Sequence, residues 1–140
     1  MQLTRRTTRH LSRGLVATGL LAALVAGGGT AQAHGGGGDR VRVSGSCSAG
    51  THQELVAGRD DGRIEVELEV DSSRAGQTWH VTMSDNGARF LSRTRVTRGR
   101  SGSFEIARTV ANRAGRDRIT ARATNARTGE RCTAALTVRG

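Results

Sequence analysis

The sequence predicts an all-β domain, a sandwich of seven or eight antiparallel strands. Apolar and polar residues alternate in short runs, turn residues recur about every 8–12 positions, and no run has the period of a helix. The chain has 140 residues, of which 35% are hydrophobic, with two Cys and no Pro. This composition excludes a coiled coil, a multispan membrane protein, a disulfide-dense toxin and a zinc ribbon.

Residues 1–33 have the pattern of a secretory signal peptide. A basic start with four Arg precedes an apolar stretch at 15–26, which is too short to cross a bilayer of about 30 Å as a helix. Ala31-Gln32-Ala33 then supplies the small residues expected before a cleavage point. We therefore expect an extracellular protein, exported by a Sec or twin-arginine route, with no membrane span after cleavage. Residues 34–39 form a flexible Gly-rich lead-in, and 40–140 form the domain.

The individual strands follow from alternation and turn signals. Ile64, Val66, Leu68 and Val70 alternate with three Glu, which predicts a strand with one buried and one wet face. Asn86-Gly87 is a strong signal for a two-residue hairpin. Further strands are expected at about 41–47, 54–59, 77–84 and 132–138, and 98–102 is expected to be an exposed loop. Three more strands are marked only by their apolar residues: Phe90 and Leu91, then Phe104 and Ile106, then Ile119, Ala121 and Ala123. The number and size of these strands fit an immunoglobulin-like antiparallel β-sandwich.

Two stretches of the chain carry a resemblance to known families. Residues 113–132 resemble the last hairpin of bacterial immunoglobulin-like repeats, with Gly115, Ile119, Ala121, Ala123, Asn125 and Gly129 at the matching places. The Gly76-Gln77-x-Trp79 motif and the late Thr-Gly-Glu-x-Cys ending at Cys132 are similar to those of small uncharacterised secreted proteins of actinobacteria. The resemblance implies an immunoglobulin-like fold and carries no known activity.

Cys47 and Cys132 are predicted to form one disulfide. Two Cys in an exported chain pair more readily than they bind metal, and the chain has no C-x-x-C motif. Such a bridge would join the first strand to the last, and closing so long a loop is worth roughly 4–5 kcal/mol in the chain-entropy model.

Two patterns raise the question of metal binding. Cleavage after Ala33 would expose His34, whose amine and imidazole chelate Cu(II) with a second His, His52 or His80. The four Gly after His34 argue against a rigid site, and we expect no cofactor. Glu65, Glu67 and Glu69 share one sheet face, but Ca²⁺ takes about six to eight oxygens, so we expect a solvated face paired with Arg on a neighbouring strand.

Charge is distributed unevenly along the chain. After residue 33 there are 18 Arg against 12 acidic residues, and 13 of these Arg lie in 77–140. A dense group falls on one hairpin and the loop after it: Arg89, Arg93, Arg95, Arg98 and Arg100. By alternation the first three are expected to share a strand face, where they would hold phosphates or carboxylates. The alternative is a solubilising face in an Arg-rich composition.

The function predicted from these residues is that of a secreted, non-enzymatic domain that binds anionic envelope polymers through the Arg-rich hairpin. No nucleophile, phosphate-loop or metalloprotease motif is present. Nucleic acid is an unlikely ligand because Phe90 is the only aromatic residue interleaved with the Arg. A small secreted inhibitor or ligand carrier acting on another secreted protein or ligand is the alternative, followed by a copper-binding protein that uses His34.

Overall fold

The computed structural model describes residues 40–139, which form eight β-strands. The predicted signal peptide and lead-in lie outside the described residues. The strands are β1 (Val41–Ser46), β2 (His52–Asp60), β3 (Arg63–Asp71), β4 (Thr78–Asp85), β5 (Ala88–Val96), β6 (Ser103–Ala111), β7 (Arg116–Asn125) and β8 (Arg131–Arg139). Within this range the chain has no helix that could cross a membrane. The predicted all-β class is confirmed.

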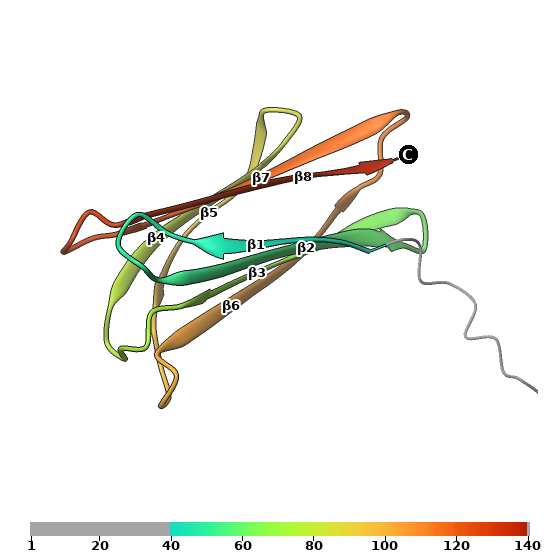
Figure 1. Cartoon of the computed structure of the whole chain (residues 1–140). Helices are drawn as coiled ribbons and strands as arrows, with labels where there is room; N and C mark the ends of the chain where they lie inside the picture. The colour runs from blue at the N-terminus through green and yellow to red at the C-terminus, as the bar shows by residue number, and fades with distance from the viewer. Residues whose placement is uncertain (1–39, 140) are drawn as a thin grey trace, which may run out of the picture. The chain divides into compact units, whose positions relative to one another are not determined.

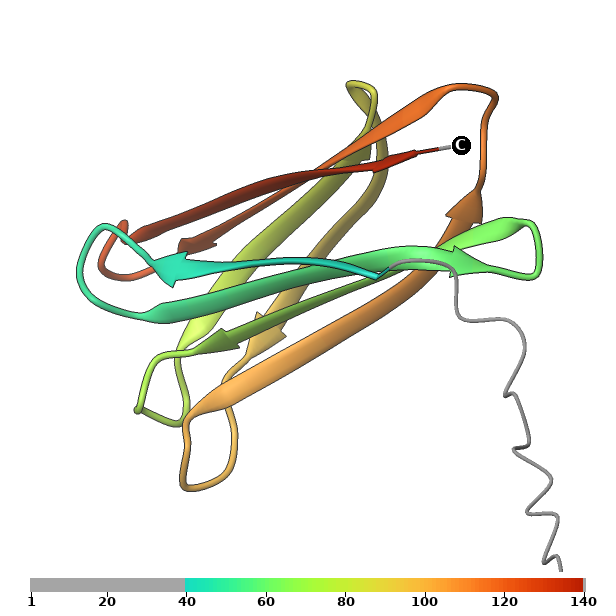
Figure 2. The same cartoon turned by 45° about the vertical axis from the view of Figure 1, so that its right-hand side comes forward.

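The eight strands form two four-stranded antiparallel sheets that pack face to face (Figure 1). One sheet has the order β1-β2-β3-β6 and is called sheet A; the other has the order β5-β4-β7-β8 and is called sheet B. The chain crosses between sheets from β3 to β4, from β5 to β6 and from β6 to β7. At one edge of the sandwich β1 and β2 contact β8, while at the other β5 and β6 diverge from the turn that joins them (Figure 2).

Alternating apolar residues from both sheets fill the space between them. On β3 the predicted inward residues Ile64, Val66, Leu68 and Val70 are all buried. Trp79 on β4 is fully buried, and its ring centroid lies 6.5 Å from that of Phe104 on β6. The two sheets are therefore joined by a large aromatic contact near the edge where β5 and β6 separate.

The opposite edge is held by the predicted disulfide between Cys47 and Cys132, which the structure confirms. Buried Glu130 accepts hydrogen bonds from the backbone amides of Ala49 (3.2 Å) and Thr51 (3.0 Å), both in the loop after β1. Gln53 Nε2 also donates to the carbonyl oxygen of Thr133 at 2.7 Å. Covalent and polar contacts thus fix the first and last strands to each other across the two sheets.

β2 is the strand that differs most from its predicted bounds. The second strand was expected at 54–59, but β2 runs from His52 to Asp60 because it pairs along its whole length with β3 and also with β1. This double pairing places Gln53 inside a strand that the sequence pattern alone begins one residue later.

Candidate functional site

Five arginines, which we call the Arg edge, lie on β5, on β6 and on the turn between them, at the edge where these two strands diverge: Arg93, Arg95, Arg98, Arg100 and Arg108. Arg93 and Arg95 are paired with Val81 and Trp79, so they lie on the side of sheet B that faces sheet A. They avoid burial because β5 is the outermost strand of its sheet: Arg93 is exposed and Arg95 half-buried.

Arg108 is a member of this edge that the sequence interpretation did not single out. It is paired with buried Val66, which places it on the inner side of β6, and it is nevertheless exposed. Counting along both strands from the antiparallel bridge between Arg98 and Ser103, Arg108 on β6 stands at the same level as Arg93 on β5, although the two strands diverge. The alternation of Phe104, Ile106 and Arg108 was the signal that could have revealed it.

The prediction that Arg89 shares a face with Arg93 and Arg95 is wrong. A β-bulge shifts the register at Met83/Ser84, so that Arg89 is paired with Ser84 on the outer side of sheet B. The extra residue is Phe90, which packs against the core next to buried Leu91. Two consecutive apolar residues cannot both face the core in a regular strand, and the bulge lets them do so.

The turn between β5 and β6 is closed by backbone hydrogen bonds. Arg98 and Ser103 exchange both bonds of a bridge (2.9 and 3.1 Å), and the amide of Gly102 donates to the carbonyl of Gly99 at 3.3 Å. Arg98 and Arg100 are exposed as predicted, but Gly102 is buried against the backbone of Arg74. The guanidinium groups therefore project from a defined turn.

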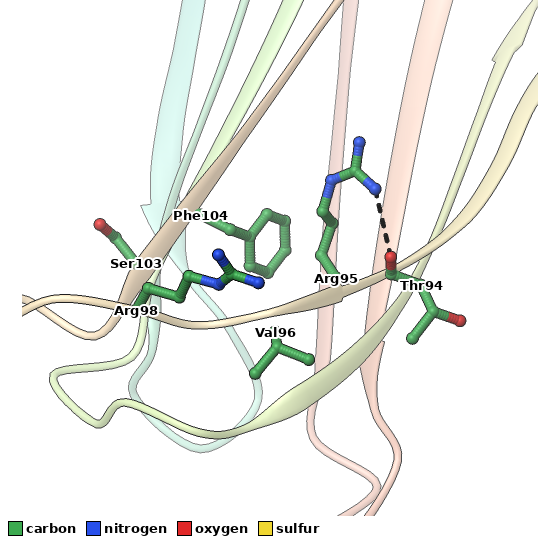
Figure 3. A pocket seen from close by; sticks show the side chains of 6 residues that line it. All are labelled: Thr94, Arg95, Val96, Arg98, Ser103 and Phe104. Carbon is green, nitrogen blue, oxygen red and sulfur yellow. Dashed lines mark hydrogen bonds between the residues drawn. The ribbon is translucent and has the colours of Figure 1, made fainter.

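A hollow of about 430 Å³ lies above this turn, where the two strands begin to separate (Figure 3). Phe104 and Val96 provide its apolar wall, and Arg95 and Arg98 extend beside them. Val96 is 41% exposed, which is unusual for a large apolar side chain in this chain. Arg95 Nη1 donates to the carbonyl of Thr94 at 3.2 Å, which leaves its other guanidinium protons for a ligand.

No acidic residue neutralises the Arg edge within the described residues. The ion pairs of 4.0 Å or less in residues 40–139 involve Arg40, Arg42 and Arg113. Arg108 Nη1 bonds only the neighbouring carbonyl of Ala107, at 2.8 Å. The edge therefore concentrates positive charge that can form bidentate bonds with phosphate or carboxylate groups.

Glu65, Glu67 and Glu69 lie on the outer face of sheet A, and the charge of two of these carboxylates is neutralised by an Arg. The side chain of Arg40 lies over Gly58 of β2, where an added Cβ on Gly58 would lie 2.7 Å from the Cγ of Arg40. The guanidinium group of Arg40 forms ion pairs with Glu65 (3.3 Å) and Glu67 (3.8 Å) on β3. The expected pairing with Arg is thus present for two of the three carboxylates, although the partner precedes β1 and does not lie on a strand beside β3. Residues 40–139 contain no group of three or more His, Cys, Asp or Glu arranged to hold a metal ion.

The two candidate partners of His34 are on different sheets. His52 begins β2 in sheet A, and His80 lies on β4 in sheet B, where its Nδ1 is 3.1 Å from Thr94 Oγ1. Both side chains are exposed. His34 itself lies outside the described residues.

A buried acidic pair was missed by the sequence interpretation. Asp85 at the end of β4 and Asp117 near the start of β7 are 5% and 0% exposed, and one oxygen of each has no hydrogen-bond partner among the described residues. Asp117 Oδ2 accepts from the amide of Arg113, whose Nε lies 4.0 Å from Asp85 Oδ2. Burial raises the pKa of the Asp85 carboxyl, the charge of Asp117 raises it further, and Arg113 opposes both effects.

Comparison of the chain with the models of protein families, with curated proteins and with solved structures gives no match.

Proposed function

We propose that this protein is a secreted, non-enzymatic, immunoglobulin-like domain that binds anionic polymers of the cell envelope through the Arg edge. The observation that carries the proposal is the placement of Arg93, Arg95, Arg98 and Arg108 along one sandwich edge, none of them in an ion pair of 4.0 Å or less among the described residues, with Arg95 and Arg98 beside one hollow. An unneutralised group of guanidinium donors attracts a polyanion mainly by releasing its counterions.

Export is supported by the signal-peptide pattern of residues 1–33 together with the disulfide. Disulfides persist in oxidising compartments and are rare in the cytosol. The Cys47–Cys132 bridge therefore fits a domain that acts outside the cytoplasm.

The immunoglobulin-like part of the proposal is supported by the strand connections. Counting from β2, the second and fifth strands (β3 and β6) pair in one sheet, and the third and sixth (β4 and β7) pair in the other. The same pairs form the centre of an immunoglobulin sandwich, in which the last two strands also form a hairpin as β7 and β8 do here. On this assignment β1 is an additional edge strand.

The absence of nucleophile and phosphate-loop motifs from the sequence supports a binding role. The hollow beside Phe104 is the feature that favours the alternative of a ligand carrier, since its volume falls within the range of small-molecule pockets. Its lining also includes four polar residues beside Phe104 and Val96, and two of these are Arg, so an anionic group of a polymer can contact it as well.

The test is retention of the protein on a purified anionic wall polymer across a salt gradient. The variant replaces Arg93, Arg95 and Arg98 by Gln. The matched control replaces Arg116, Arg127 and Arg139 by Gln, which removes the same charge from exposed positions away from the edge. We expect the edge variant to elute at much lower salt and with a smaller salt dependence, while the control stays close to wild type. If the two variants lost the same retention, the binding would depend only on the net charge of the protein, and the proposal would be overturned.

A further inference from the structure

The β-bulge that removes Arg89 from the Arg edge places it in a second basic site. Arg89 and Ser84 are paired on the outer side of sheet B, and the next outward residue on β4, Thr82, is paired with Arg122 on β7. Ser84 is also paired with Thr120 of β7. Two arginines thus flank three hydroxyl groups on adjacent strands.

These five side chains line one hollow of about 340 Å³ on the sheet surface: Thr82, Ser84, Arg89, Thr120 and Arg122. Neighbouring strands are about 4.7–4.9 Å apart and alternate residues about 7 Å apart, so the long Arg side chains can converge above the hydroxyl groups. Arg89 and Arg122 are exposed, and neither forms an ion pair of 4.0 Å or less with an acidic residue in 40–139.

We infer that this hollow binds a phosphate group. Two guanidinium groups offer bidentate N–H donors, and the three hydroxyl groups offer one O–H donor each. A carboxylate has two oxygens to accept these bonds, whereas a terminal phosphate group has three strong acceptor oxygens and carries more charge. The number of donors and their arrangement around one point therefore favour phosphate over carboxylate.

The lining of this hollow also differs in chemistry from a surface that binds neutral sugars. Its side chains are hydroxyl and guanidinium groups with Met83 beneath, and no aromatic ring lines the hollow to stack on a sugar face. Met83 is 1% exposed and so offers no apolar platform. The inference does not depend on the Arg edge, because its residues lie on the other side of sheet B.

The test is a titration of the ¹⁵N-labelled protein with inorganic phosphate, followed by the amide shifts, with acetate at matched ionic strength as the comparison anion. We expect saturable shifts at Thr82, Ser84 and Thr120 with phosphate and weaker, non-saturating shifts with acetate. Arg122→Gln and Arg89→Gln are each expected to weaken phosphate binding at least about tenfold, since each removes charge-assisted bonds.

Arg118→Gln is the matched control, because Arg118 is exposed on β7 four residues from Arg122 and does not line the hollow. We expect it to bind phosphate nearly as wild type does. Equal weakening by Arg118→Gln and Arg122→Gln, or saturable shifts confined to Ser103 and Phe104 at the Arg edge, would overturn the site. The second result would leave the proposed function standing, so the two failures are distinguishable.

Discussion

The carboxyl groups of Asp85 and Asp117 lie beside each other on adjacent strands of sheet B, both buried. Both occupy inward positions, where the alternation of their strands calls for apolar residues. Because burial and the charge of Asp117 raise the pKa of the Asp85 carboxyl, the folded state holds that proton more tightly than the unfolded chain does. The stability contribution of Asp85 is then complete below the unfolded pKa of about 3.9 and is lost as the pH rises through the raised folded value.

Replacing Asp85 by Asn should therefore stabilise the protein at neutral pH and reduce the fall of its stability as the pH rises above the unfolded pKa. The amide has a similar shape and carries no charge to desolvate. Urea unfolding at several pH values measures the effect. Glu105→Gln removes one carboxylate from the exposed face of β6 and serves as the control, with little expected change. A variant that is less stable than wild type at pH 7, with an unchanged pH slope, would show that Asp85 is held as a stabilising anion by Arg113.

The disulfide between Cys47 and Cys132 should contribute roughly 4–5 kcal/mol, because it closes a loop of 85 residues in the unfolded chain. The double variant Cys47→Ala/Cys132→Ala measures this contribution by urea unfolding. Intact mass before and after a thiol reagent tests the bridge in protein collected outside the cells of an expressing host. If the chain is exported as proposed, the same mass locates the new N-terminus, which we expect at or very near His34. Two reactive thiols in that protein would contradict the disulfide.

Trp79 gives a prediction that separates volume from hydrogen bonding. It is fully buried, and its Nε1 has no hydrogen-bond partner among the described residues. Trp79→Ala should cost about 3–5 kcal/mol through the cavity it leaves. Trp79→Phe should cost much less, because it keeps most of the volume and removes a buried donor without a partner. Circular dichroism follows both, since neither variant retains a Trp. Equal costs would contradict the expectation, since the volume kept by Phe would then contribute nothing to stability.

Local patterns were sufficient to predict the strands but not their partners. The alternation of β3 and the Asn86-Gly87 turn each depend on neighbouring residues, so a single sequence reveals them. The pairing of β3 with β6 joins segments that are separated by two strands, β4 and β5, and by two crossings between the sheets. No local signal encodes such a contact, because it is decided by how both apolar faces are buried together.

The sequence was sufficient to predict which segment carries the Arg residues of the candidate site, but only partly on which face of the sheet each of them lies. The Arg-rich segment was evident, but simple alternation put Arg89 on the wrong face, since it ignored the consecutive apolar pair Phe90-Leu91 that the bulge accommodates. Arg108 was missed because its strand was interpreted through its apolar residues. The buried acids Asp85 and Asp117 were missed because acidic residues are normally expected at the surface. Asp85 also directly precedes a turn, where polar residues are usually exposed.

Gly99 and Gly102 allow the closed turn of the Arg edge to be tested with a matched pair of substitutions. Both have a left-handed backbone, with φ of 69° and 65°. An added Cβ at Gly99 meets nothing within 4 Å, whereas one at Gly102 would lie 2.1 Å from the backbone nitrogen of Arg74. Gly99→Ala should therefore cost only the backbone penalty of about 1–2 kcal/mol and leave polymer retention unchanged.

Gly102→Ala carries the same backbone penalty, and in addition it must push the turn away from Arg74. That displacement breaks the hydrogen bond from the Ser72 amide to the Gly102 carbonyl (3.1 Å) and moves Arg98 and Arg100 with the turn. We expect a larger loss of stability than for Gly99→Ala, together with weaker retention on the anionic polymer. If the two variants lost the same stability and retained the same affinity, the turn would be free to move and the Arg edge would not depend on its closure.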